Sequence, residues 1–379
     1  MERGIGMQSL PQNDIDLQRL AVIHFPGFGS RSLKKIRETF GDIGCAWSAS
    51  TKKLSYIGLS EKKQASFQLW KKTFDLQKAI YRLASNQIAP LFLHDLDYPP
   101  LLGQISDPPE VLFIRGNLSA APAIALIGSR KHTLYGKSVV ERLVQDLGAQ
   151  GLTIVSGLAL GIDGLAHRAA LQSKANTIAV LGSGVDAESI YPREHTHLAA
   201  DIVEAGGVLM SEFPPGTRTR KEYFPMRNRI IAGLSLATVV IEARKKSGSL
   251  ITARLALDSN REVLAVPGSI WSRSSEGCHH LIESGARPCV SAQSVLDAIA
   301  LDHPTLAAEA RAALPLGPLE RRILDLLSAP MHIDDLTRTE QMSPAEAATA
   351  LSLLELKGYV SQTGGQHWVS CSGLRSAPA

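Results

Sequence analysis

The sequence lacks the features that would place it in a membrane or in an oxidising compartment. No apolar run approaches the roughly 18 residues that a membrane span needs. The first ten residues are typical of neither a signal peptide nor a transit sequence. The four cysteines are far apart and form no CxxC pair, which favours free or buried thiols in a reducing cytosol. We therefore expect a cytoplasmic protein without a membrane partner.

Clusters that bind metals or support nucleophilic catalysis are missing as well. The histidine pairs His195/His197 and His279/His280 have no cysteine or carboxylate at ligand spacing, so surface or capping histidines are favoured over a metal site. No Ser-His-Asp or Cys-His arrangement stands at a spacing that suggests a nucleophile. The pattern predicts no resident metal, no cofactor and no catalytic residue.

Length and charge divide the chain into regions. Its 379 residues leave room for two or three domains with ample cores. The net charge of +4 conceals two basic regions: Arg31–Arg82 holds 12 basic and 4 acidic residues, and Glu212–Arg254 holds 9 and 3. From Val290 onward, 6 basic residues face 10 acidic ones. The basic regions predict a polyanionic partner, and the acidic end of the chain predicts a different role.

The centre of the chain contains two strands that each lead into a glycine-containing turn and a helix. Ile124–Ile127 is a short apolar run of the buried parallel type, and Gly136–Gln150 has the apolar spacing of a helix. Leu152–Val155 is a second strand, and the turn at residues 156–164 opens a second helix. Such turns bring N–H groups and helix N-termini to one edge of a sheet, an arrangement that binds phosphate.

These glycines do not match the common nucleotide fingerprints. Gly157 to Gly164 reads GxxxGxxG, whereas a dinucleotide fingerprint needs GxGxxG. Gly136–Ser138 imitates the end of a P-loop, but Lys131 stands where the first glycine is required. Lys137 is therefore interpreted as a surface residue at a helix start. Each glycine alone is better explained by tight turning; both turns together with Arg130 favour a bound phosphate group.

Alternating strands and helices from Ala123 to Ile299 predict an α/β fold with a doubly wound, extended Rossmann-like parallel sheet. Two earlier strands, Ile88–Leu93 and Val111–Ile114, are expected at the edge of this sheet. The main strands are expected at Ile124–Ile127, Leu152–Val155, Thr177–Leu181, Val208–Met210, Thr238–Ile241, Val263–Val266 and Pro288–Val290. Binding is expected beyond the C-terminal ends of these strands.

Smaller units flank this core, which we place at residues 86–300. Residues 1–85 predict a small helical domain whose Pro-Gly turn, Phe25–Gly29, resembles a helix-hairpin-helix or SAM-like unit. Cations follow the turn at Arg31, Lys34, Lys35 and Arg37. They suit either DNA phosphate or a solvated lysine-rich face.

After an alanine-rich linker at residues 301–313, residues 314–379 predict a winged-helix-like domain. The pattern consists of helical runs at Leu319–Leu327, Ile333–Thr337 and Ala345–Lys357, followed by a hairpin with a Gly-Gly turn. The domain is acidic, and its third helix offers no basic face to read DNA. We therefore expect it to contact protein.

Two charged segments are expected at the binding edge. Residues 212–229 mix Arg218, Arg220, Lys221, Arg227 and Arg229 with Tyr223 and Phe224, and interleaved cations and rings suit single-stranded nucleic acid. In residues 242–252, small hydroxyl side chains could donate to phosphate at a helix start. A salt bridge to Glu212, Glu222 or Glu242 is the alternative for Arg227 and Arg229, and we expect it for one of them.

Together these segments resemble the DNA-processing protein A (DprA/Smf) family over almost the whole chain. The resemblance rests on Tyr98–Leu102, Ile127–Arg130, Ser156–Asp163, Ala166–His167, Tyr191–Pro192, Ser211–Gly216, Phe224–Gly233 and Ser247–Thr252. It implies a non-enzymatic protein that binds and protects incoming single-stranded DNA and loads the RecA recombinase onto it during natural transformation, usually as a homodimer. The DNA-binding residues are then expected at Gly128, Ser129, Arg130, Ser156, Gly157, Ala159, Gly161, Lys221, Phe224, Arg227, Arg229, Ser247, Gly248, Ser249 and Thr252.

An enzyme is the alternative. The core is also similar to that of nucleotide phosphoribohydrolases related to lysine decarboxylase-like proteins, which release a base from a nucleoside monophosphate. Asp163, Glu212 and Glu242 are the candidate carboxylates for that chemistry. However, the PGGxGT signature of those enzymes has no counterpart at Lys246–Thr252. Incubation with nucleoside monophosphates, followed by a search for free base, separates the two interpretations.

Overall fold

The computed structural model describes residues 13–302 and 318–370, apart from positions 328, 341, 357, 358 and 365. Contacts between residues divide the chain into two units, Met1–Ala298 and Ile299–Ala379. Among the helices of the described residues, none is long and apolar enough to cross a membrane.

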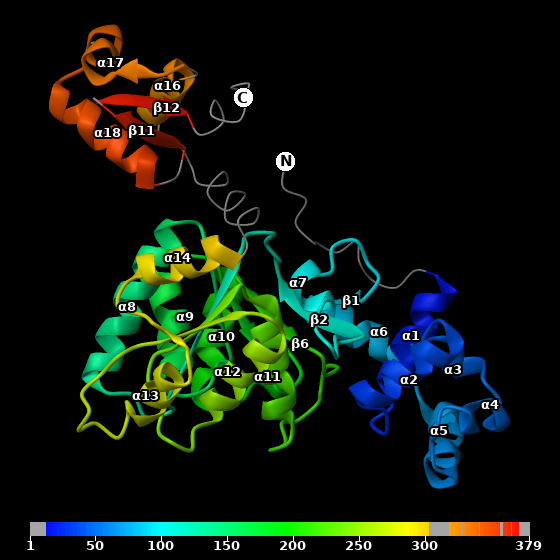
Figure 1. Cartoon of the computed structure of the whole chain (residues 1–379). Coiled ribbons are helices and arrows are strands. Elements are labelled where there is room, and N and C mark those ends of the chain that lie inside the picture. The colour runs from blue at the N-terminus through cyan, green and yellow to red at the C-terminus, as the bar shows by residue number, and fades with distance from the viewer. Residues whose placement is uncertain are drawn as a thin grey trace. The chain divides into compact units, whose positions relative to one another are not determined.

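The first unit begins with helices packed around aromatic side chains (blue in Figure 1). The helices are α1 (Asp14–Ile23), α2 (Ser30–Phe40), α3 (Cys45–Ser48), α4 (Thr51–Ser55), α5 (Glu61–Thr73) and α6 (Leu76–Ser85). The predicted Pro-Gly turn joins α1 to α2, and its Phe25 and Phe28 lie 5.0 and 4.8 Å from the ring of buried Phe67. Two cations beyond the turn are used within the fold, because Lys34 donates to the Ser106 carbonyl and Arg37 pairs with Glu110 at 2.8 Å.

A nine-stranded sheet forms the core of the first unit. Its order is β1-β2-β6-β5-β4-β3-β7-β8-β9, and β3 to β9 run parallel, with β1 and β2 antiparallel at the edge. The strands are β1 (Ala89–Phe92), β2 (Val111–Gly116), β3 (Ala123–Ile127), β4 (Thr153–Ser156), β5 (Thr177–Val180), β6 (Val208–Ser211), β7 (Ala237–Val240), β8 (Glu262–Ala265) and β9 (Arg287–Pro288). The strand order reverses between β3 and β7, so the doubly wound fold is confirmed. The last strand is shorter than expected and ends before Val290.

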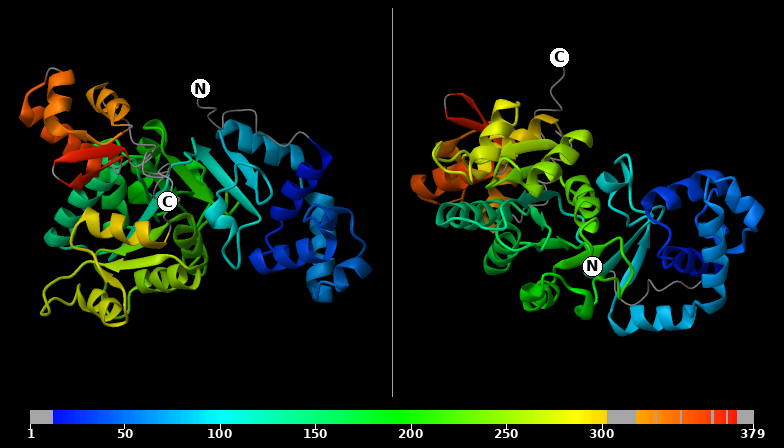
Figure 2. Two further views of the ribbon diagram at one scale, coloured as in Figure 1. Left: turned by 45° about the horizontal axis from the view of Figure 1, so that its top comes forward. Right: turned by 90° about the horizontal axis from the view of Figure 1, so that it is seen from below.

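Helices cover both faces of the sheet (Figure 2). They are α7 (Pro100–Gly103), α8 (Leu134–Ala149), α9 (Ile162–Ser173), α10 (Thr196–Glu204), α11 (Tyr223–Leu234), α12 (Gly248–Asp258), α13 (Glu276–Glu283) and α14 (Ala292–Asp302). Because alternate residues of a strand face opposite sides, Leu209 packs in the cluster that contains Ile202 of α10, whereas Val208 and Met210 pack in the cluster that contains Ile230 of α11. The two hydrophobic layers place the ends of the parallel strands, and the turns that follow them, at one edge.

The second unit has the predicted winged-helix arrangement. Its elements are α16 (Pro318–Leu326), β10 (Met331–His332), α17 (Ile333–Glu340), α18 (Pro344–Leu356), β11 (Val360–Gly364) and β12 (His367–Ser370). A capping box starts α18, in which the Ser343 amide donates to Glu346 and the Glu346 amide donates to the Ser343 hydroxyl. Leu301 and Asp302 still belong to α14, and the rest of the predicted linker lies outside the described residues.

Candidate nucleic-acid interface

Two turns meet at the C-terminal edge of the sheet, one after β3 and one after β4. The Ile162 amide, at the start of α9, donates to the Ser129 carbonyl at 3.1 Å and joins the two turns. Gly161 has a φ of +83°, and a Cβ at this position would lie 2.2 Å from the Ser129 carbonyl oxygen. Both the backbone conformation and the close approach therefore require glycine. The loop after β3 carries Arg130 with its side chain exposed.

The turn after β4 is held from both sides at Gly157. The Gly157 amide donates to Asp163 at 3.1 Å, and the Gly157 carbonyl accepts from Arg227 at 2.5 Å. Arg227 also donates to the carbonyl of Val180 at the end of β5. Asp163 and Arg227 thus hold Gly157 between them, an arrangement called here the Gly157 clamp. A Cβ on Gly157 would lie 2.5 Å from the Arg227 guanidinium, so only glycine leaves room for it.

Burial dominates the electrostatics of this clamp. Arg227 is 4% exposed, and burial lowers its pKa to about 10, although the charge of Asp163 acts in the opposite direction. Burial likewise raises the pKa of Asp163, and Arg227 partly offsets that shift. The assignment of Arg227 to the DNA-contacting residues is therefore corrected, because its guanidinium is enclosed and donates to backbone carbonyls.

Arg229 requires the same correction. It donates to both Glu212 carboxylate oxygens, at 3.0 and 2.7 Å, and approaches the Asp107 carboxylate at 3.3 Å. The residue is 9% exposed, so the charge is neutralised inside the protein. The expectation that one of these two arginines forms a salt bridge with Glu212, Glu222 or Glu242 is confirmed, with Glu212 as the partner of Arg229, so the charge of Arg229 is not offered to a ligand.

Three hydroxyl side chains from the predicted site also lie inside the fold. Ser156 is buried and donates to the Leu126 carbonyl at 2.6 Å, which ties β4 to β3. Ser249 and Thr252 are buried along α12, whereas Gly248 is exposed and Ser247 caps the helix. We therefore withdraw Ser156, Ser249 and Thr252 as side-chain contacts for DNA, because burial leaves their hydroxyls out of reach.

The exposed part of the edge combines a cation with an aromatic ring. The Arg130 guanidinium lies 5.3 Å from the centroid of the Phe224 ring, and the Tyr191 ring lies 5.9 Å from that ring. A Cβ on Gly182, beyond β5, would lie 3.6 Å from a Phe224 ring atom, so Phe224 covers this end of the sheet. Lys221 is exposed three residues before Phe224, just ahead of α11. Arg130 and Phe224 thus meet in space although 93 other residues separate them in sequence.

The remaining predicted residues divide between these two turns and α12. Gly128, Ser129 and Gly161 lie in or beside the joined turns, and the Ser129 hydroxyl donates to the Lys131 carbonyl at 2.8 Å. The Ala159 amide, like that of Gly157, hydrogen-bonds Asp163 and faces inward. The sequence analysis did not predict that Asp163 holds the amides of the turn after β4. Its position in the first turn of α9, where carboxylates commonly accept from backbone amides, could have indicated that role.

The three carboxylates considered for enzyme chemistry are all engaged in the fold. Asp163 holds the Gly157 amide, and Glu212 pairs with Arg229. Glu242 is 3% exposed and accepts from the amide and the hydroxyl of Thr133 at 3.0 and 2.5 Å. Asp163 therefore stabilises a turn, Glu242 the start of α8, and Glu212 a buried ion pair with α11.

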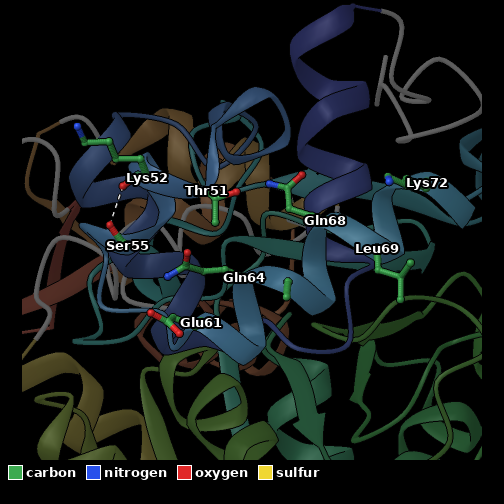
Figure 3. Close-up of a pocket in the computed structure, with 9 residues that line it drawn as sticks. Thr51, Lys52, Ser55, Glu61, Gln64, Gln68, Leu69 and Lys72 are labelled. Carbon is green, nitrogen blue, oxygen red and sulfur yellow. Dashed lines mark hydrogen bonds between the residues drawn. The ribbon is translucent and has the colours of Figure 1, made fainter.

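A hollow of about 660 Å³ lies away from this edge, between α4 and α5 (Figure 3). Thr51 and Ser55 line it from α4, and Gln64 and Gln68 line it from α5. Its two lysines stand at opposite ends of the lining residues in Figure 3. The hollow therefore does not gather positive charge as the sheet edge does.

The fold and the edge define a Rossmann-like α/β protein with a winged-helix unit at its C-terminal end. Residues 89–300 match the family model for DNA recombination-mediator protein A, and residues 307–366 match the DprA winged helix domain. The chain belongs to the DNA recombination-mediator protein A (DprA/Smf) family, and the predicted resemblance is confirmed.

Named relatives cover much of the chain. Protein Smf of Escherichia coli is 40% identical over 280 residues, which are 71% of this chain and 74% of the relative. DNA processing protein DprA of Bacillus subtilis is 46% identical over 203 residues, 53% of this chain and 67% of the relative. The structure of DprA from Streptococcus pneumoniae covers 74% of this chain and 97% of its own, with a TM-score of 0.65 and 35% identity. DprA from Helicobacter pylori, described with a single-stranded DNA binding mode, covers 57% and 97%, with a TM-score of 0.50 and 29% identity.

Proposed function

We propose that this chain is a DNA-processing protein that binds single-stranded DNA at the C-terminal edge of its sheet and loads the RecA recombinase onto that DNA during natural transformation. The observation that carries the proposal is the exposed Arg130 guanidinium beside the Phe224 ring. A cation next to a ring matches the alternation of phosphate and base along a single strand. The family relationship and the single-stranded DNA binding mode of the Helicobacter pylori relative support it.

The turns add a surface that a DNA backbone can approach closely. Gly128 and Ser129 carry little side-chain bulk, and the clamp at Gly157 fixes the neighbouring turn before any ligand arrives. A site that is fixed in advance loses less conformational entropy on binding. We assign phosphate contact to Arg130 and Lys221, base stacking to Phe224, and close backbone approach to the small residues of the first turn.

We also propose that the protein is not an enzyme, that it is cytoplasmic, that it acts as a homodimer and that it needs no cofactor. The three carboxylates considered for hydrolysis are engaged by Gly157, Arg229 and Thr133, which supports binding over catalysis. Release of free base from a nucleoside monophosphate would contradict this part of the proposal.

The proposed DNA site is tested by three single substitutions. Arg130→Ala and Lys221→Ala should each weaken binding to oligothymidylate and flatten the dependence of log affinity on log salt by about 0.7, because each removes one phosphate contact. Phe224→Ala should cost roughly 1–3 kcal/mol of binding free energy without changing that slope, since stacking involves no counterion. Fluorescence anisotropy over a salt series measures both quantities.

Lys174→Asn is the matched control for these variants. Lys174 is an exposed cation at the C-terminal end of α9, the end away from the joined turns, and its φ of +57° is one that asparagine tolerates. This variant should keep the wild-type affinity and slope, and circular dichroism should show an intact fold for all four proteins. An Arg130 variant with wild-type affinity and slope would remove the first turn from the DNA site.

The acidic winged-helix unit is proposed to contact protein and not DNA. A protein that ends at Asp302, the last residue of α14, should therefore retain the affinity of the full chain for single-stranded DNA. The acidic end of the chain repels a polyanion, so its removal is expected to leave affinity unchanged or slightly improved. Anisotropy titrations of the two proteins at equal salt test this, and loss of binding on truncation would contradict it.

A further inference from the structure

The C-terminal edge of the sheet carries a second group of exposed cations, beyond those of the proposed site. Arg244, Lys245 and Lys246 follow β7, and Arg273 lies in the loop that follows β8. Within the described residues, no carboxylate lies within ion-pair distance of these four side chains. Their charge is therefore available to an anion from outside the protein.

These cations continue the edge that begins at Arg130. Strands β3, β7 and β8 are parallel neighbours, so the residues that follow them stand side by side. The loop after β8 is tied to the loop after β7, because Ala243 donates to the Ser274 carbonyl at 2.8 Å and Gly277 donates to the Ala243 carbonyl at 2.7 Å. The positive side chains thus follow one another across three strands.

The loop after β8 also presents two large apolar side chains to solvent. Trp271 is 89% exposed and Ile270 is 75% exposed. The loop is nevertheless held in place, since Tyr135 donates to the Pro267 carbonyl at 2.7 Å and the His279 ring lies 3.1 Å from the Gly268 carbonyl. An exposed indole on a supported loop, beside unpaired cations, is a surface on which a nucleobase can stack.

A hollow of about 460 Å³ adjoins this loop and the start of α8. Its walls are Thr133, Tyr135, Glu242, Pro267, Gly268, Ser269, Ser272 and Ser275. The Glu242 carboxylate is held by Thr133 and would repel a phosphate, whereas the hydroxyls of Ser269 and Ser272, which are not buried, can form hydrogen bonds with a base. The lining therefore favours a base or sugar inside the hollow and phosphates on the cationic rim.

We propose that the bound single-stranded DNA continues from the Arg130 turn across the ends of β7 and β8. Its phosphates lie on Arg244, Lys245, Lys246 and Arg273, and one base stacks on Trp271. This inference rests on the proposed function and extends its site to a second stacking position. Phe224 covers the end of β5 and Trp271 follows β8, four strand spacings away, which is about 19 Å at about 4.8 Å per strand. A strand of several nucleotides is thus held at both ends of the edge.

The test uses the full chain and a 20-nucleotide oligothymidylate. Binding should quench tryptophan fluorescence in the wild type, and the quench should disappear in Trp271→Phe, which keeps a ring for stacking and most of the affinity. Trp271→Ala should weaken binding about 5- to 150-fold, the range that loss of one stacked base produces. Simultaneous replacement of Arg244, Lys245 and Lys246 by alanine should flatten the salt dependence by up to about 2.

Tyr81→Ala is the control. Tyr81 is an exposed aromatic on α6, 73% exposed, and lies outside the proposed site, so this variant should bind the oligonucleotide as the wild type does. Wild-type affinity in both Trp271→Ala and the triple alanine variant would overturn the inference if Arg130→Ala still weakens binding. A quench that persists in Trp271→Phe, or a change only in self-association, would overturn it as well. If the wild type does not bind the oligonucleotide at all, the proposed function itself fails.

Discussion

Arg229→Met is expected to lower the free energy of unfolding by about 3–5 kcal/mol, because it leaves the Glu212 carboxylate in the protein interior without its partner. The guanidinium donates to both Glu212 oxygens and also approaches Asp107 at 3.3 Å. Burial already raises the pKa of Glu212, and Arg229 opposes that shift. Urea denaturation followed by circular dichroism measures the loss.

Arg254→Met is the matched control for this prediction. Arg254 is an exposed arginine on α12, and its replacement should change stability by less than about 0.5 kcal/mol. The fraction of the Arg229 variant that remains folded should bind single-stranded DNA as the wild type does. If the Arg229 variant kept the wild-type stability and instead showed a flatter salt dependence of DNA binding, Arg229 would be a DNA contact and its structural role would be contradicted.

Arg227→Met is expected to cost a similar amount, about 3–5 kcal/mol, for a different reason. It leaves the carbonyls of Gly157 and Val180 without their donor and leaves Asp163 as a buried charge. The turn after β4 should also loosen, so the variant should bind DNA more weakly even under conditions in which it is fully folded. Denaturation gives the first effect and anisotropy the second.

A double-mutant cycle with Asp163→Asn tests whether the electrostatic attraction between Arg227 and Asp163 contributes to this cost. Removal of both charges should destabilise the protein by less than the sum of the single substitutions, with a coupling of about 0.5–3 kcal/mol. Asparagine keeps a side-chain oxygen that can accept from the Gly157 amide, so its single cost should be the smaller one. Strictly additive costs would show that the clamp acts through hydrogen bonds alone.

The strands and turns were predictable because their signals are local. Runs such as Ile124–Ile127 are continuously apolar since both faces of a parallel sheet are covered, and a glycine follows where the chain turns sharply. The winged-helix order followed from helical spacing and from the Gly-Gly turn of its hairpin. The family resemblance rested on such motifs, and residues 89–300 bear it out.

The burial of the arginines was only partly readable. Arg227, Ile230, Ile231 and Leu234 recur at helical spacing on the face of α11 that packs against the sheet, so the pattern itself placed Arg227 inward. Because arginine is usually found at the surface, Arg227 was nevertheless predicted to be exposed, and that prediction is wrong. A buried arginine is stable only where carbonyls or carboxylates meet it, and those of Arg227 and Arg229 come from other strands and loops.

The sequence by itself determined the element order, the basic and acidic regions and the family, and it indicated the sheet edge that we propose as the binding site. The tertiary structure alone decided which cations remain at that edge. The partner of Arg227 at Gly157 and the partner of Arg229 at Asp107 lie 70 and 122 positions away, so no local pattern contains them. Arg130 and Phe224 meet for the same reason. Strand order, which long-range packing sets, brings distant turns together. It separates the arginines that are buried in the fold, Arg227 and Arg229, from Arg130, which stays exposed at the proposed site.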